Sequence, residues 1–409
     1  MIWLLFLYLV LYPFGQLLSF QVLPSGRIHA VDLAASLVVL FWLFQLLLKR
    51  RIPRIPLATP ILSFLGVAVF SLALGSIGKP LSSIAVGASY LARLVLYFFF
   101  YFAAFDFLNR DLYKEKLRAT IYNSLIVCGA FIAILGLLGY VIYPDTKALS
   151  EFGWDNHYYR LVGPLLDPAF TGIILVLFLI LVTLKKWVGR KEQALGLFLF
   201  LIAWIALSLT YSRASYAGAL AFFAAAFIAK KNVGFIVGGV LLFVATFYLL
   251  PHPKASAGTN LARTQTVISR VNNYEEALLV GLKNPAFGVG YNMYALASKG
   301  STFQGWEGKI VHNGSGVHSS FLFVFATMGT AGLLVYLYLW VKILVLGWNG
   351  RKTVYGLVLF CSTAALLVES VFDNSLFYPW VMGWMGILLA MQEEQKPNHK
   401  HQDTNKHQI

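Results

Sequence analysis

The sequence predicts an all-α polytopic membrane protein, with about 12 transmembrane helices and a large outer loop that carries short helices. The chain of 409 residues is 59% hydrophobic and only 12% charged, with a mean hydropathy of +0.72. Soluble globular proteins have about a quarter charged residues, so this chain lacks the polar surface that water requires. Many of its apolar stretches reach the roughly 20 residues that a bilayer-spanning helix needs. The same composition excludes collagen, disordered chains and small disulfide-rich scaffolds.

Separate apolar segments account for this topology. Because a backbone inside a bilayer must satisfy its own hydrogen bonds, each segment is predicted to be a helix. The segments cover residues 2–23, 31–48, 57–77, 84–107, 119–142, 167–184, 194–211, 214–229, 234–250, 318–341, 353–372 and 375–391. Only Asp373 and Asn374 separate the last two. No small-residue cleavage site closely follows the first segment, so we expect it to be retained rather than removed as a signal peptide.

The distribution of Lys and Arg predicts that both termini face the cytoplasm. Basic residues cluster in the short segments that would then be cytoplasmic, such as 49–54 and 110–118, whereas the short outer segments hold few. Cytoplasmic loops show this bias. It explains the net charge of +15 without a nucleic-acid partner, and none is expected. Residues 1–391 would form one membrane domain, and residues 392–409 a disordered cytoplasmic tail.

Two predicted outer segments, 143–166 and 251–317, contain the polar residues of greatest interest. In the first, aromatic residues and a histidine surround Arg160. The second includes the amphipathic stretch Arg270–Leu282, in which apolar residues recur at helical spacing. This stretch is expected to form an external helix on or near the membrane.

Three predicted spans begin with polar residues at the outer end. Asp167 precedes the sixth span, the segment 210–215 (TYSRAS) opens the eighth, and His318 opens the tenth. A helix N-terminus offers free N–H groups and a partial positive charge, which suits a phosphate. Arg160 and Arg213 adjoin two of these termini, so the sequence predicts a clamp for a diphosphate.

Each of these residues also has a structural interpretation. A polar residue at a helix start is commonly only a cap, and an Arg at a span end commonly reaches the headgroups. For Arg213 the functional interpretation is favoured, because its tight loop must hold the guanidinium between helices near the membrane boundary. His318 suits a general base or a satisfied interfacial histidine, while His312 and His157 lack a helical anchor. Arg93 is expected to reach the headgroups rather than a lipid-linked phosphate.

Neither a metal nor a cofactor is expected. A metal site needs several converging ligands, and His312 and His318 form no recognised metal-ligand spacing. The lone G-x-G at 288–290 lacks the strand and helix of a nucleotide-binding fold. Cys128 and Cys361 lie inside apolar runs and are expected to be buried thiols.

Four blocks follow one another in a distinctive order. The first two are RLVGPLLDP, which begins at Arg160, and LTYSRAS at 209–215. The third is the segment 269–290, with Arg270 and the run NPAFGVG, and the fourth is 318–332, from HSSFL to GTAG. Together the blocks resemble the motifs R-x-x-G, T-x-S-R-[GA], R…A…NPlfGvG and H-[NS]-x-[YF]-L…G-x-x-G. These are motifs of the O-antigen ligase and polymerase superfamily of bacterial membrane glycosyltransferases.

The chain departs from the family at two positions. Ser319 follows the histidine where the family often has Asn, and Tyr274 stands where it usually has Trp. His318, rather than His312, matches the family's histidine, because the aromatic, Leu and Gly-x-x-Gly spacing follows His318.

The resemblance implies an inverting, metal-independent transfer of a polyprenyl-diphosphate-linked glycan to an acceptor hydroxyl on the outer face of the inner membrane. In the implied mechanism Arg160, Arg213 and Arg270 bind the diphosphate, Arg213 also acts in catalysis, and His318 deprotonates the acceptor. The implied partners are a lipid-linked oligosaccharide or polysaccharide donor, a glycan or glycolipid acceptor, and membrane lipids.

Several alternatives stay compatible with the sequence. A ligase, a polymerase and a protein O-oligosaccharyltransferase differ in their acceptor. A transporter or flippase of a lipid-linked glycan belongs to a different class, and would need ionisable residues near the midplane and broken helices in repeat-related halves. Asp106 and Glu369 instead lie toward span ends, and polar residues gather at one face, which favours an enzyme.

Overall fold

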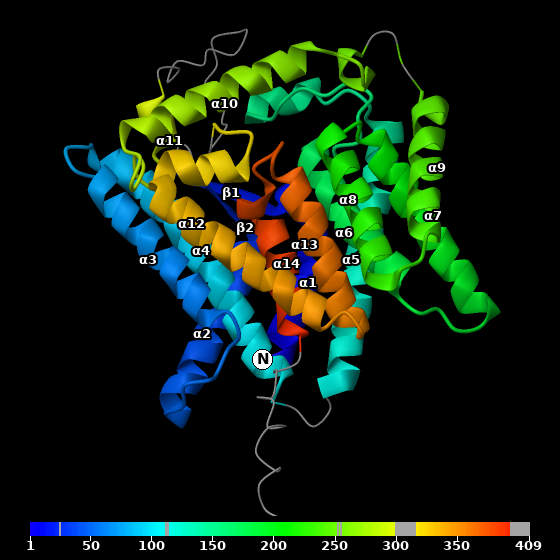
Figure 1. Ribbon diagram of the computed structural model, residues 1–409, viewed down its shortest axis with the longest axis horizontal. Coiled ribbons are helices and arrows are strands. Elements are labelled where there is room, and N and C mark those ends of the chain that lie inside the picture. The colour runs from blue at the N-terminus through cyan, green and yellow to red at the C-terminus, as the bar shows by residue number, and fades with distance from the viewer. Residues whose placement is uncertain (24–25, 111–113, 252, 254–255, 299–315, 393–409) are drawn as a thin grey trace, which may run out of the picture.

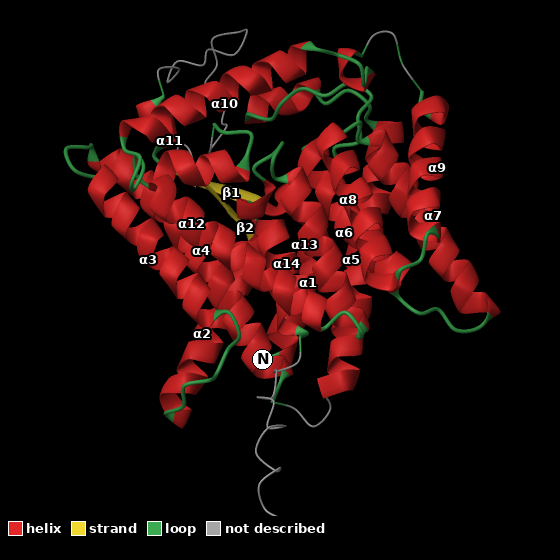
Figure 2. Cartoon of the chain, in the orientation of Figure 1, coloured by secondary structure: helices red, strands yellow, loops and turns green. Residues whose placement is uncertain are grey.

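The protein is a bundle of mostly lengthwise helices with one long helix lying across one end (Figure 1). The computed structural model describes residues 1–409 apart from 24–25, 111–113, 252, 254–255, 299–315 and 393–409. The tail at 393–409 and His312 therefore lie outside the described residues. Of the described residues, 76% are helical. Figure 2 shows a single small strand pair among the helices.

The α-helices follow one another along the whole described chain. They are α1 (Ile2–Leu11), α2 (Ala30–Lys49), α3 (Ala58–Gly75), α4 (Leu81–Leu108), α5 (Lys114–Ile142), α6 (Pro168–Leu184), α7 (Arg190–Leu209), α8 (Arg213–Lys230), α9 (Gly234–Leu249), α10 (Gln265–Lys283), α11 (Tyr294–Ala297), α12 (Ser320–Asn349), α13 (Val354–Glu369) and α14 (Pro379–Ala390). Short 3₁₀ turns η1 (Tyr12–Leu18), η2 (Lys147–Phe152), η3 (Gly163–Leu165), η4 (Ala257–Thr259) and η5 (Ser375–Phe377) connect some of them, and strands β1 (Ser19–Leu23) and β2 (Gly26–His29) form an antiparallel hairpin.

An all-α membrane protein fits this architecture. Among the described residues, six helices, α2, α3, α4, α5, α7 and α12, are long and apolar enough to cross a membrane. Further helices are apolar but shorter, such as α6 and α13. The expected number of about 12 spans remains a prediction.

The first predicted span, 2–23, is wrong beyond Leu11. Pro13 lies in the first turn of η1 and has no N–H to continue the ladder of α1. Gly15 then adopts a φ of 56°, and a Cβ there would lie 2.4 Å from the carbonyl oxygen of Pro164. The chain therefore turns into the β1–β2 hairpin, which is also the one departure from an all-helical fold within the described residues.

Helix α6 occupies the centre of the bundle. Its sequence is apolar on every side, and nearly all of its residues are buried. The N-terminal end of this helix therefore lies amid the other helices rather than at the edge of the bundle. The start of α14 is fixed against it, because the ring of Tyr378 stacks on Phe170 with centroids 4.0 Å apart.

The N-terminus lies at the end of the bundle away from α10 (Figure 1). The last described residue, Gln392, is bound near the start of α5, where Arg118 Nη2 donates to its carbonyl oxygen at 3.4 Å. The side of the membrane that each end faces remains a prediction.

Candidate functional site at the α10 end of the bundle

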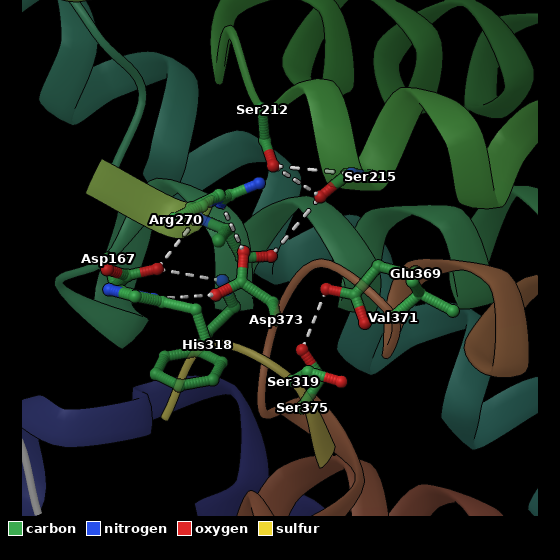
Figure 3. Close-up of polar contacts among 12 residues, drawn as sticks. Asp167, Ser212, Ser215, Arg270, His318, Ser319, Glu369, Val371, Asp373 and Ser375 are labelled. Carbon is green, nitrogen blue, oxygen red and sulfur yellow. Dashed lines mark hydrogen bonds and ion pairs between the residues drawn. The ribbon is translucent and has the colours of Figure 1, made fainter. Parts of the chain in front are cut away.

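Two helix N-termini meet under the site. Asp167 caps α6, since its Oδ1 accepts hydrogen bonds from the backbone N–H groups of Ala169 at 2.7 Å and of Phe170. Ser212 caps α8 by accepting from the N–H of Ser215 at 3.3 Å. The Ser215 hydroxyl also donates to the Ala169 carbonyl oxygen at 3.3 Å, which joins the two helix starts. Figure 3 shows Ser215 beside Ser212, whose hydroxyl lies 2.9 Å from that of Ser215. The predicted cap Asp167 is confirmed, Ser212 is the cap within the predicted 210–215 segment, and both helices point their positive ends to the same place.

Arg160 is held against the turn that opens α8. Its Nε donates to the carbonyl oxygen of Thr210 at 3.0 Å, and the N–H of Leu161 donates to Leu209 at 2.8 Å. Burial, and secondarily the guanidinium of Arg263, lower the pKa of Arg160 to about 10. The arginine still carries its positive charge at neutral pH, at a cost in desolvation that a bound anion would offset.

Arg213 is the first residue of α8 and reaches the connection between α9 and α10. Its Nη1 donates to the carbonyl oxygens of Leu261 at 3.3 Å and Arg263 at 3.1 Å. The turn between α7 and α8 spans only Thr210 to Ser212, so Arg213 lies at the end of the bundle that α10 crosses (Figure 1). That Arg213 lies near the membrane boundary stays a prediction.

Helix α10 supplies a polar face that organises the rest of the site. Its predicted existence over Arg270–Leu282 is confirmed, and it extends from Gln265 to Lys283. Asn273 accepts from the N–H of His318 at 2.9 Å, and its amide donates to Gly316. One turn of α10 therefore fixes the segment that carries His318.

Asp373 connects Arg270 with His318. Arg270 Nη2 forms an ion pair with Asp373 Oδ2 at 3.1 Å, and His318 Nδ1 lies 3.9 Å from Asp373 Oδ1 (Figure 3). The Asp373 side chain is 14% exposed, whereas that of His318 is 42% exposed. The imidazole is thus backed by a carboxylate on one side and accessible on the other. Tyr274, from the next position of α10, donates to the Val371 carbonyl oxygen at 2.8 Å and holds this turn.

The sequence predicted that the tenth span begins at His318, but α12 begins two residues later. It begins at Ser320, runs to Asn349 and breaks at Gly329, where φ is 66° and ψ is −164°. The break leaves backbone N–H and C=O groups of α12 without partners inside the helix, and the 285–290 segment forms hydrogen bonds with them. The N–H of Thr330 donates to the carbonyl oxygen of Pro285, and the N–H of Val289 donates to the carbonyl oxygen of Ala326. The NPAFGVG motif therefore fastens the end of α10 to the kink of α12.

Sequence reasoning missed two residues of the site, Asp373 and Arg263. The sequence analysis treated Asp373 only as a residue that separates the last two apolar segments. A carboxylate at the end of a predicted span could itself have indicated a functional site. Arg263 lies before the amphipathic stretch, and no motif distinguishes it. Glu369, at the end of α13, is also close; it is fully buried, and its Oε1 accepts from Ser375 Oγ at 2.7 Å.

The expectation for Arg93 is wrong. Its Nη2 forms an ion pair with Asp32 Oδ2 at 2.9 Å and also donates to the Arg27 carbonyl oxygen. Its side chain is 18% exposed and is paired with Asp32 of α2. A neighbouring carboxylate one helix away explains this choice, because an ion pair compensates the buried charge.

The predicted thiols Cys128 and Cys361 are free and buried, as expected. Among the described residues, no three His, Cys, Asp or Glu side chains are grouped as a metal site would require.

The fold and the site define a helical membrane protein with a cationic centre at one end of its bundle. Residues 196–337 match the family model described as O-Antigen ligase, which supports the resemblance of the chain to the O-antigen ligase and polymerase superfamily. The match includes Arg213, Arg270 and His318 but neither Arg160 nor Asp373. No curated protein matches the chain. The apolar helices and the family together indicate a bacterial membrane protein with a ligase- or polymerase-type function.

Proposed function

We propose that this protein is an inverting, metal-independent glycosyltransferase, which moves a glycan from a polyprenyl diphosphate to an acceptor hydroxyl. The main support is the meeting of Arg160, Arg213 and Arg270 with the Asp373–His318 pair at one end of the bundle. The family supports the general ligase or polymerase type. The donor class and the chemical step are inferred from the charges.

The arginines suit the leaving group. Arg matches phosphate oxygens in a bidentate manner, and the N-termini of α6 and α8 add two partial positive charges. As the bond between the sugar and the phosphate breaks, negative charge grows on the diphosphate. Fixed donors at that position are commonly worth a few kcal/mol each in the transition state.

His318 suits the general base. Its Nδ1 faces Asp373, so Nε2 is the ring nitrogen left for the acceptor. The acceptor oxygen attacks the anomeric carbon and gives its proton to Nε2, while the bond from that carbon to the phosphate oxygen breaks. Its electron pair leaves with the polyprenyl diphosphate. Attack from the opposite face inverts the anomeric configuration, and Asp373 stabilises the resulting imidazolium.

The proposed location is the inner membrane, with both termini in the cytoplasm and the site outside. The basic segments near 49–54 and 110–118 support this orientation. The donor would then enter from the outer leaflet, and the acceptor, a glycan or glycolipid, from the exposed side of His318. A transporter would instead require ionisable groups near the midplane, whereas this cluster lies at the α10 end.

Deletion of the gene, followed by analysis of the lipid-linked glycans and the surface polymers, tests the proposal. We expect a polyprenyl-linked glycan to accumulate in the outer leaflet while one surface polymer is lost. Accumulation in the inner leaflet would support the transporter instead. Unchanged glycan pools and unchanged surface polymers would contradict both functions.

A further inference from the structure

A short outer segment, residues 256–263, crosses directly over Arg160. Ser256 Oγ donates to the Tyr158 carbonyl oxygen at 2.6 Å, which anchors the segment beside Arg160. At Gly258 the approach is closest, because a Cβ there would lie 2.8 Å from Arg160 Cδ and 3.5 Å from Arg263 Nη1. The guanidinium of Arg263 and the side chain of Arg160 are therefore neighbours across this glycine.

Arg263 also reaches the second arginine pair of the site. Its carbonyl oxygen accepts from Arg213 Nη1 at 3.1 Å, so its backbone is fixed beside Arg213. Burial lowers the pKa of the Arg263 guanidinium, and the positive charges of Arg213 and Arg270 lower it further. Arg263 is thus within electrostatic reach of Arg160 on one side and of Arg213 and Arg270 on the other.

The site is arranged for an anion with more than one charge. Four guanidiniums gather within reach of three carboxyl groups, those of Asp167, Asp373 and Glu369. Like charges this close repel one another, and their burial adds a desolvation cost. A bound polyanion would relieve both.

A histidine beside the four guanidiniums, His157, also supports a bound ligand at this place. Burial, followed by the charges of Arg160 and Arg263, lowers the pKa of His157 to about 3, so its imidazole is neutral. Its Nε2 is buried and has no hydrogen-bond partner in the described structure. An unsatisfied buried polar atom next to two guanidiniums is typical of a place that a ligand completes.

We propose that Arg263 is a fourth diphosphate-binding residue, which pairs with Arg160 on one phosphate group while Arg213 and Arg270 hold the other. The inference rests on the proposed function and adds to it that each phosphate group has its own pair of arginines. Two arginine pairs for two phosphate groups make the site selective for a prenyl diphosphate over the corresponding monophosphate. The side chain of Arg263 carries this selectivity, because its carbonyl oxygen serves Arg213 whatever the side chain is.

The test measures calorimetric binding of farnesyl diphosphate and farnesyl monophosphate to the detergent-purified full chain. We expect the wild type to prefer the diphosphate. In Arg263→Ala the Kd for the diphosphate should rise about 10- to 100-fold, the value of one charge-assisted contact, while the Kd for the monophosphate changes less than about threefold. Arg27→Ala is the matched control, since Arg27 lies over Trp154 and donates to Phe152, outside the cluster. It should bind both probes as the wild type does.

A second variant distinguishes the loss of a ligand contact from misfolding. Arg263→Lys keeps the charge but loses the planar fork, and should show an intermediate loss for the diphosphate at an unchanged melting temperature. Wild-type diphosphate affinity in Arg263→Ala overturns the role of Arg263 and leaves the proposed function standing. An equal loss for both probes also overturns it, because the side chain would then support the site generally. A wild type that binds neither probe overturns the proposed function itself.

Discussion

His318 Nδ1 lies 3.9 Å from Asp373 Oδ1, and the other oxygen of the same carboxylate pairs with Arg270 at 3.1 Å. One carboxylate thus links the proposed base, His318, to Arg270 of the proposed diphosphate clamp. The arrangement allows the charge formed on His318 and the charge held by Arg270 to be balanced by the same residue.

Asp373→Asn should slow transfer about 10- to 100-fold, since a neutral amide stabilises the imidazolium of His318 far less than a carboxylate does. Donor binding should be retained or improved, because Arg270 loses its competing partner. Transfer rates and donor affinities of the purified variant check this. Tyr274→Phe is the control, since it removes a hydrogen bond to nearby Val371 without changing charge. Equal rates in Asp373→Asn and the wild type would separate Asp373 from the mechanism.

Arg213→Lys should impair transfer by about tenfold or more, although the charge is preserved. Arg213 Nη1 already serves the carbonyl oxygens of Leu261 and Arg263, and a single ammonium cannot replace the fork that also faces the ligand. Arg190→Lys, at the exposed start of α7, should be neutral. Wild-type turnover in Arg213→Lys would identify Arg213 as a headgroup contact.

Asp167 makes stability depend on pH. Burial raises the pKa of its carboxyl from 3.8 to about 6, so the folded state takes up a proton more readily than the unfolded chain. Its contribution to stability therefore increases as the pH falls through 6. Asp167→Asn keeps the cap and stays neutral, so its melting temperature should exceed that of the wild type at pH 7.5 and approach it at pH 5. A difference that is the same at both pH values would rule out this titration.

Gly329→Ala should destabilise the protein by about 2 kcal/mol or more, because φ is positive there and the added Cβ would clash. That Cβ would lie 2.4 Å from the backbone carbon of Ala286. Thermal unfolding in detergent measures the loss. Gly238→Ala provides the control, since nothing lies within 4 Å of its Cβ position. Similar melting temperatures for the two variants would mean that the kink is not required.

Local signals predicted the parts of the fold that depend on local chemistry. The cap residue Asp167 was identified because a side-chain oxygen before an apolar run satisfies the first N–H groups of a helix. The amphipathic period located α10 in the same way. Hydropathy alone extended the first span past Leu11, since it does not register that Pro13 and Gly15 end a helix here.

The site was predictable where a residue adjoined a helix start, and not where distant segments complete it. Arg213 was found from its tight turn. Asp373 and Arg263 escaped detection because their roles depend on contacts across the fold, with Arg270 and with Arg160. The kink at Gly329 likewise depends on the 285–290 segment that pairs with it.

The most direct measurement compares wild-type protein with His318→Ala for donor binding and for glycan transfer in reconstituted membranes. The exposed imidazole beside Asp373 should be needed for the chemical step alone. We therefore expect the variant to fold and to bind donor as the wild type does, while its transfer rate falls about 10²- to 10⁴-fold. Transfer at the wild-type rate by His318→Ala would contradict the account.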